Sequence, residues 1–151
     1  MYANAKAGYF KYQKNDFLNL TPAEIVDRLF KALYSCIDDA EDAIRRRLIA
    51  KKGEKISRAI AIVGELQASL DMEKGGELSE SLYLLYDFMI RELLMANMEN
   101  SVDRLETVKT TIRPIMEGWS KILEGAEEKS PTVIPASQGE QTRPRPLQVA
   151  G

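Results

Sequence analysis

Apolar residues recur every three or four positions between Thr21 and residue 126, which is the period of amphipathic α-helices. One run, LYLLYDFMIRELLMA, spans Leu82 to Ala96 and holds only three polar residues. A helix on the surface of a small protein needs a single apolar stripe, whereas this helix is apolar nearly all round. The sequence therefore raises the question of what covers the remaining faces of this helix.

The first predicted helix begins at Thr21-Pro22-Ala23-Glu24. Thr21 can accept a hydrogen bond from the first turn, proline suits the first helical position, and Glu24 completes a capping box. Apolar residues from Val26 to Leu48 follow in steps of three and four, so we expect this helix to run to about Ile49. Four carboxylates on this helix alternate with its apolar stripe and are expected to form a solvated face: Asp38, Asp39, Glu41 and Asp42.

Gly53 interrupts the pattern, and a second helix is expected from about Glu54 to Asp71. Ile62 lies off its apolar stripe, which consists of Ile56, Ala59, Ile60, Val63, Leu66 and Leu70. Gly75-Gly76 marks the next turn.

The third helix contains residues 82–96 and is expected to end near Asn97. Asn100 or Ser101 can cap a fourth helix, which has Pro114 in its interior. Four amphipathic helices joined by short turns predict an all-α fold, an antiparallel up-down four-helix bundle.

The flanking segments differ from this body in composition. Residues 1–20 are rich in aromatic side chains without a clear period and are expected to form a flexible N-terminal segment. Residues 127–151 hold four of the six prolines and few large apolar residues, so we expect a disordered C-terminal tail. Residues 21–126 then form the helical domain.

Projected at 100° per residue, residues 82–96 fall into three bands. The first is an adequate core stripe and holds Leu82, Leu85, Met89, Leu93 and Ala96; the second lies beside it and holds Tyr83, Tyr86, Ile90 and Leu94; the third lies between the charged residues and holds Leu84, Phe88 and Met95. Two interpretations stay open. One is a wide core with scattered surface apolar residues. The other is a groove that receives an apolar helix of a partner.

Composition narrows the function. The net charge is −2 with no basic excess, which argues against nucleic-acid binding. The absence of histidine removes the commonest general base and zinc ligand, and Cys36 is the only cysteine. No phosphate-binding loop or nucleophile elbow occurs, so neither enzyme activity nor a cofactor or metal is expected. The N-terminus lacks a signal peptide, and the apolar run is shorter than the roughly 20 residues of a membrane span. A cytosolic protein without stable membrane insertion is expected.

Specific motifs are similar to those of a known family. They are Tyr12-Gln13-Lys14-Asn15, Thr21 to Val26, Ile60 through Glu65-Leu66 to Ser69-Leu70-Asp71, Gly75-Gly76-Glu77-Leu78, Leu82, Leu85 to Met89, Leu93, Ala96-Asn97 and Trp119. Their order and spacing resemble the flagellar secretion chaperone family FliS from residue 12 to about 123. The chain departs from the family pattern at Phe30, where tyrosine is common, and at Arg28, where an apolar residue is common.

The resemblance implies a cytosolic four-helix export chaperone. Members of this family bind the C-terminal segment of flagellin, prevent its premature polymerisation and support its delivery to the flagellar secretion apparatus. Export gate components or a co-chaperone are further partners that the resemblance allows. A homodimer without client, formed by the 82–96 helix and its own copy, and a helical adaptor for a non-flagellin partner are the alternatives.

The residues expected to bind the partner come from the N-terminal segment and the second and third helices. They are Tyr12, Ile60, Val63, Leu66, Leu82, Leu85, Tyr86, Met89, Ile90, Leu93 and Asn97.

Overall fold

The computed structural model describes residues 19–129, with side chains described to residue 126. This part of the chain forms four helices and no strand: α2 (Pro22–Arg45), α3 (Ile49–Ala68), α4 (Gly76–Glu99) and α5 (Val102–Lys129). The predicted all-α four-helix architecture is confirmed. Predictions for the rest of the aromatic segment and for residues 130–151 lie outside the described residues.

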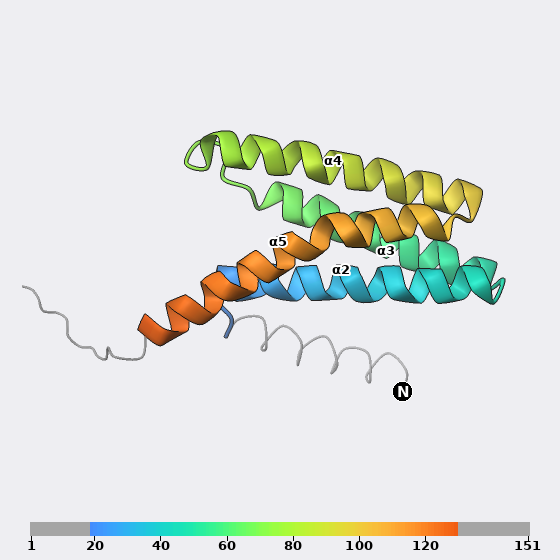
Figure 1. Ribbon diagram of the computed structural model, residues 1–151, viewed down its shortest axis with the longest axis horizontal. Coiled ribbons are helices and arrows are strands. Elements are labelled where there is room, and N and C mark those ends of the chain that lie inside the picture. Colours follow the sequence, from blue (N-terminus) through green and yellow to red (C-terminus); the bar gives the residue numbers. More distant parts are fainter. Residues whose placement is uncertain (1–18, 130–151) are drawn as a thin grey trace, which may run out of the picture. The chain divides into compact units, whose positions relative to one another are not determined.

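Helix α3 lies between α2 and α4 and packs against both (Figure 1). Successive helices run in opposite directions, which gives the up-down order that short connections favour. The first of two compact units ends at Met116 and contains α2, α3, α4 and the first half of α5. The second unit begins at Glu117 and contains the rest of α5.

The first helix starts where the sequence predicts. Thr21 Oγ1 accepts from the Glu24 backbone N–H at 3.1 Å, and the Thr21 N–H donates to Glu24 Oε1 at 2.9 Å. Pro22 occupies the first helical position, where its missing N–H costs nothing. The predicted capping box is confirmed.

The turn between the first two helices lies earlier than predicted. Helix α2 ends at Arg45 and α3 begins at Ile49, so the prediction of a helix break at Gly53 is wrong. Arg47 adopts a left-handed conformation with φ of 61° and reverses the chain. Gly53 lies inside α3, where an added Cβ would meet no atom within 4 Å. Its cost of roughly 0.5–1 kcal/mol relative to alanine does not end the helix.

The glycine turn before α4 is confirmed and has a steric cause. Gly76 has a φ of 52°, which favours glycine. A Cβ on Gly75 would lie 2.8 Å from the Asp71 carbonyl oxygen and would overlap the Ser79 side chain. Ser79 Oγ donates to this same carbonyl at 2.9 Å, so the turn and the start of α4 are joined.

The core is drawn from all four helices. Its largest fully buried side chains are Phe30, Leu33 and Ile37 of α2, Ile56, Val63 and Leu66 of α3, Met89 and Leu93 of α4, and Leu105, Val108 and Ile112 of α5. Ile62 is only 7% exposed, although it lies off the predicted stripe. The reason is that α3 packs against two neighbours and needs a wider apolar face than a single stripe provides.

The junction of α4 and α5 resolves the choice between two predicted caps. Asn100 ends α4 in a left-handed conformation with φ of 53°. Ser101 Oγ accepts from the Arg104 backbone N–H at 3.2 Å and caps α5. Pro114 lies within α5, as predicted. The helix continues to Lys129, three residues beyond the predicted end of the domain at 126.

Candidate functional site

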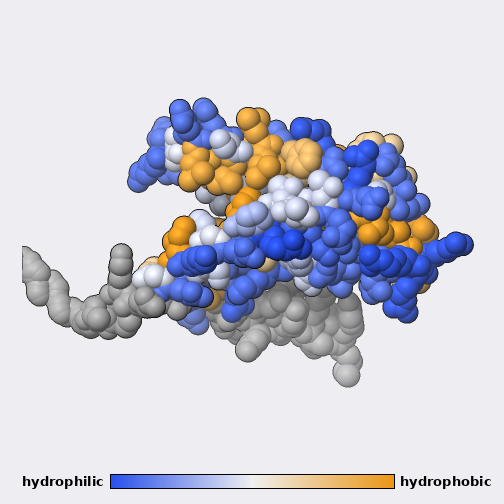
Figure 2. Space-filling model, viewed as in Figure 1, coloured by the Kyte–Doolittle hydropathy of each residue, from blue (hydrophilic) through white to orange (hydrophobic). Residues whose placement is uncertain are grey.

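Helix α4 carries an apolar face that the bundle leaves uncovered. Among the described residues, nine large apolar side chains are exposed and α4 holds five of them: Leu78, Tyr83, Leu84, Leu94 and Met98. Figure 2 shows hydrophobic side chains over α4, interrupted by hydrophilic ones. No such residue lies on α2 between residues 22 and 45, so the uncovered surface is concentrated on one helix. Concentrated exposed apolar surface is typical of a binding surface.

A glutamine fastens α3 to α4 at one edge of this face. Gln67 Nε2 donates to the Tyr83 carbonyl oxygen at 3.1 Å and to Asp87 Oδ1 at 2.9 Å. Because the Tyr83 carbonyl is part of the α4 backbone, Gln67 fixes the position of α4 as well as the rotamer of Asp87. The apolar side chains beside it are therefore presented from a positioned helix.

A buried lysine fastens the opposite end of the same pair of helices. Lys52 is only 7% exposed, and its Nζ donates to the Asn97 carbonyl oxygen at 2.9 Å and to Asn100 Oδ1 at 2.6 Å. A cation at the end of a helix interacts favourably with its negative dipole end and satisfies carbonyls that lack an intrahelical partner. The end of α4 is therefore held by α3.

The predicted partner-binding residues separate into groups by burial. Five are core residues, exposed by 3% or less: Val63, Leu66, Tyr86, Met89 and Leu93. Five are half-buried: Ile60, Leu82, Leu85, Ile90 and Asn97. Tyr12 lies outside the described residues. The half-buried group has side-chain surface available to a partner without rearrangement, whereas the buried group forms the floor beneath it. Their role in binding stays a prediction.

Tyr86 belongs to the buried group by its chemistry as well as its position. Burial raises the pKa of its phenol to about 12, so the side chain is neutral throughout the physiological range. It is 3% exposed. Tyr86 therefore contributes apolar ring surface to the core.

The predicted binding residues include none of the exposed apolar residues of α4. Leu84 is 66% exposed, Leu94 49% and Met98 77%. The available signal was the second and third bands of the helical projection, which contain Leu94 and Leu84. Family motifs favoured the core stripe instead, because the motif residues of α4 are mostly those that build the fold.

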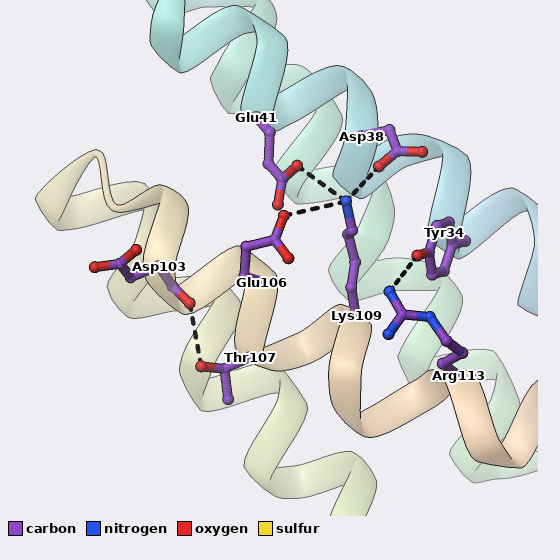
Figure 3. A network of polar contacts seen from close by, with 8 residues as sticks. All are labelled: Tyr34, Asp38, Glu41, Asp103, Glu106, Thr107, Lys109 and Arg113. Atoms are coloured by element: carbon purple, nitrogen blue, oxygen red, sulfur yellow. Dashed lines mark hydrogen bonds and ion pairs between the residues drawn. The ribbon is translucent and has the colours of Figure 1, made fainter.

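A polar cluster joins α5 to α2 (Figure 3). Lys109 Nζ lies 2.7 Å from Asp38 Oδ1, 3.0 Å from Glu41 Oε1 and 3.3 Å from Glu106 Oε2. Tyr34 adds a ring whose centroid is 5.4 Å from the ammonium nitrogen. Burial lowers the pKa of Lys109, but hydrogen bonds to the three carboxylates outweigh it, and the net shift is upward. Lys109 is therefore a permanent cation.

Glu41 contradicts the prediction of a fully solvated acidic face. Its side chain is 4% exposed, and the reason is the Lys109 ammonium that compensates its charge. Within residues 19–129, Oε2 of Glu41 accepts no hydrogen bond when Glu41 and the neighbouring Glu106 are both ionised. Burial, and then the Glu106 carboxyl, raise the pKa of Glu41. Asp38 remains 52% exposed, in agreement with the prediction.

The remaining features of the described part of the chain are its single cysteine, its metal-ligating side chains and the apolar content of its helices. Cys36 is buried, and burial raises the pKa of its thiol, which disfavours the reactive thiolate. Residues 19–129 contain no group of three or more histidine, cysteine or carboxylate side chains arranged to hold a metal ion. None of the four helices has the length and apolar content that crossing a membrane requires.

The fold and the uncovered face of α4 place the chain among small four-helix proteins with an exposed apolar surface. Comparison with known families is more specific, because the family described as "Flagellar protein FliS" matches residues 4–126. The chain belongs to this family. Membership supports a chaperone role in flagellar export.

Curated relatives agree with the family match. The flagellar secretion chaperone FliS of Salmonella typhimurium is 37% identical over 106 residues, which cover 70% of this chain and 78% of that protein. The flagellar secretion chaperone FliSB of Pseudomonas aeruginosa is 35% identical over 101 residues, covering 67% and 80%. The FliS chaperone of Bacillus subtilis is 29% identical over 116 residues, covering 77% and 86%. Similarity therefore extends over most of both chains.

Proposed function

We propose that this protein is a cytosolic export chaperone that binds the C-terminal segment of flagellin and prevents its premature polymerisation. The observation that carries the proposal is the family match over residues 4–126, together with the uncovered apolar surface of α4. A chaperone of this kind acts on unassembled client, before export, which is why we place it in the cytosol. Components of the export gate or a co-chaperone would then receive the complex.

Binding needs no chemistry beyond the burial of apolar surface. A client segment that forms amphipathic helices would lay its apolar face against half-buried residues such as Leu82, Leu85 and Ile90. The fully buried Met89 and Leu93 beneath them would fix the shape of this surface. In the assembled filament the client face would contact other subunits, so covering it competes directly with polymerisation.

The edges of the proposed client surface are positioned by polar contacts already described. Gln67 holds α3 and α4 together on one side, and Lys52 fixes the backbone at Asn97 on the other. A preorganised surface lowers the entropy cost of ordering the chaperone. Most of the conformational entropy lost on binding is then lost by the client segment as it folds.

Calorimetric titration tests the proposal. The probe is a peptide of about 40 residues from the C-terminus of flagellin of the same organism, long enough to form stable helix on a partner. We expect one-to-one binding with a negative heat-capacity change, because apolar surface is buried. If titration to about 50 µM gives neither heat nor a mobility shift, the proposed binding of the flagellin C-terminal segment is wrong.

A matched pair of variants locates the surface. Leu82→Ser removes a half-buried leucine of α4, and we expect it to weaken client binding by about tenfold, the effect of losing roughly 1.4 kcal/mol. Leu48→Ser removes a leucine that is 39% exposed at the turn between α2 and α3. This control should bind the client like the wild type. Equal effects of the two substitutions would contradict the proposed position of the surface.

A further inference from the structure

The turn between α2 and α3 exposes apolar and basic side chains next to one another. Leu48 and Ile49 are exposed by 39% and 60%. Exposed cations lie on both sides of this pair, the arginines at 45–47 before it and Lys51 after it. Figure 2 shows the same contrast at this end of the bundle, where hydrophobic side chains adjoin strongly hydrophilic ones. We call residues 45–51 the basic tip.

The positive charge of the basic tip is largely uncompensated. Residues 43–53 contain five lysine and arginine residues and no aspartate or glutamate. One of the five, Arg46, has its Nη1 atom 3.3 Å from Oδ2 of Asp42. The other three exposed cations of the tip form no ion pair with any residue of 19–129. They are therefore available to an anionic partner.

The start of α3 adds to this positive field. Its N-cap residue, Leu48, makes no side-chain hydrogen bond, and its first turn holds no acidic residue. Lys51 lies in that turn instead, where its charge opposes the positive end of the helix dipole. Natural proteins depart from such local rules mainly at functional sites. An anion bound at the tip would satisfy the N–H groups of this first turn.

Backbone hydrogen bonds fix the shape of the turn. The Leu48 N–H donates to the Ala43 carbonyl oxygen at 2.8 Å, and the Arg47 N–H donates to the Ile44 carbonyl oxygen at 3.1 Å. The start of α3 is also joined to the end of α4 by the Lys52 contacts described above. The two apolar side chains are therefore held in exposed positions by a structured turn.

We propose that the basic tip binds an anionic lipid surface. Leu48 and Ile49 would enter the boundary between headgroups and acyl chains, and the surrounding cations would lie among the lipid phosphates. Positions 45 and 46 differ by about 100° around the helix axis, so the cations are spread around the turn. A nucleic acid would pair with the cations but would leave the two apolar side chains in water, whereas a lipid surface accepts both.

This contact would be peripheral and reversible. Each basic residue near an anionic membrane surface strengthens binding by about fivefold, and the attraction falls off within a Debye length. The basic tip shares no residue with the proposed client surface, so the inference does not rest on flagellin binding. A lipid-bound tip would bring the chaperone to a membrane without any helix that spans it.

Vesicle flotation of the full chain tests the proposal. The probes are vesicles of phosphatidylcholine alone and vesicles in which about 30% of the lipid is phosphatidylglycerol. At about 50 mM salt we expect at least roughly tenfold stronger binding to the vesicles that contain phosphatidylglycerol. Raising the salt to about 500 mM should release most of the protein, because salt screens the attraction. Equal binding to the two kinds of vesicle, or binding to neither, would overturn the proposal.

A matched pair of double variants locates the charge. Arg45→Gln combined with Lys51→Gln removes two cations of the tip and should weaken binding by roughly 25-fold, about fivefold for each. Lys31→Gln combined with Lys74→Gln makes the same change of net charge at two exposed lysines outside the tip. This control should bind the vesicles nearly as the wild type does. Equal weakening of the two double variants would show that net charge governs binding, and the proposed position would be wrong.

A second matched pair tests the insertion of apolar side chains. Ile49→Ser should weaken vesicle binding by about tenfold, because an isoleucine side chain no longer leaves water. The control is Ile122→Ser, at an isoleucine of α5 that is exposed by 63%, and it should have no effect. All the substituted positions are exposed, and circular dichroism melting checks that each variant is folded. Wild-type binding by Ile49→Ser would contradict insertion and overturn the proposal.

Competition separates a lipid surface from other polyanions. Duplex DNA and polyglutamate carry negative charge but offer no apolar phase, so neither should displace the protein from the vesicles at equal concentrations of negative charge. Displacement by either would identify the basic tip as a site for acidic macromolecules, and the assignment to lipid would be wrong.

Discussion

The Nζ of Lys109 lies 3.0 Å from Oε1 of Glu41, and this contact joins α5 to α2 through two side chains that are 11% and 4% exposed. Glu41 lies on the same helix as the apolar core residues Ile37 and Ala40, so its carboxylate is held where water is scarce. Its ionised form depends on the lysine, because a buried charge without a partner is strongly destabilising.

Lys109→Met removes the ammonium and keeps much of the side-chain volume. Glu41 then loses its compensating charge, and we expect the free energy of unfolding at neutral pH to fall by about 3 kcal/mol, the lower end for breaking a buried pair. Urea unfolding followed by circular dichroism measures the change. The matched control is Asp38→Asn, because Asp38 is 52% exposed and its ion pair should contribute no more than about 1 kcal/mol. Similar losses in both variants would contradict the special role of Glu41.

Glu41→Gln should stabilise the protein increasingly as the pH rises. The pKa of Glu41 is raised above its ordinary value of 4.5, by burial first and by the Glu106 carboxyl second. The folded state therefore holds this proton more tightly than the unfolded state, and the stability gained is fully present below pH 4.5 and lost as the pH rises through the folded pKa. Glutamine imitates the protonated acid at every pH, so the difference from the wild type should grow as the pH rises above 4.5 and should level off above the raised folded pKa of Glu41.

Glu106 supplies the opposite control for this pH dependence. Its pKa is lowered, by the hydrogen bond with Glu41 first and by Lys109 second. The stability that Glu106 contributes is present above its ordinary value of 4.5 and is lost as the pH falls through the lower folded pKa. Glu106→Gln should therefore be less stable than the wild type at neutral pH, and this difference should disappear on acidification. Parallel pH profiles for the two glutamine variants would show that the carboxyls do not have these different environments.

Lys52→Met tests the fastening of α4 by α3. The substitution keeps a buried apolar stem and removes the donors to the Asn97 carbonyl and the Asn100 side chain. We expect a loss of about 1–3 kcal/mol in unfolding free energy, and faster amide exchange in the last turn of α4. Lys51→Met, at the exposed neighbouring lysine, should change stability by no more than about 0.5 kcal/mol. If amide exchange at the end of α4 is the same in Lys52→Met as in the wild type, Lys52 does not position this end of the helix.

We predict that the N-terminal aromatic segment covers part of the proposed client surface with Tyr12 as its anchor, and Tyr12→Ala tests this prediction. A tyrosine can bury its ring while its hydroxyl remains hydrated. We expect client binding weaker by about 1–3 kcal/mol, the usual size for an aromatic anchor, together with greater aggregation of the free chaperone. Calorimetry and light scattering measure the two effects, and Tyr12→Phe, which keeps the ring, should retain most of the affinity. If neither affinity nor aggregation changes in the alanine variant, Tyr12 has no part in the mechanism.

Local features of this protein could be predicted from the sequence because their causes lie within a few residues. The capping box at Thr21 and Glu24 and the cap at Ser101 depend on side chains three positions from their partners. The turn before α4 depends on Gly76 and its positive φ. The turn at Arg47 was missed because a non-glycine residue with positive φ carries no comparable local signal.

The predicted core succeeded where a helix has one apolar stripe and failed where it has two neighbours. Phe30, Leu33 and Ile37 follow the stripe of α2 and are buried. Ile62 is buried as well, because α3 lies between α2 and α4. A helical projection shows which residues share a face, but it does not show how many other helices will cover that helix.

The four amphipathic helices and the family motifs could be predicted from the amino-acid sequence, because helix period, caps and motif spacing are properties of neighbouring residues. The burial of Glu41 against Lys109, which lies 68 residues away, follows from the packing of α5 on α2. Only the tertiary structure decided that Leu84 and Leu94 remain exposed while Met89 between them is fully covered. The physical reason is that burial and charge compensation depend on which helix packs against which face, and residues distant in the chain set that arrangement.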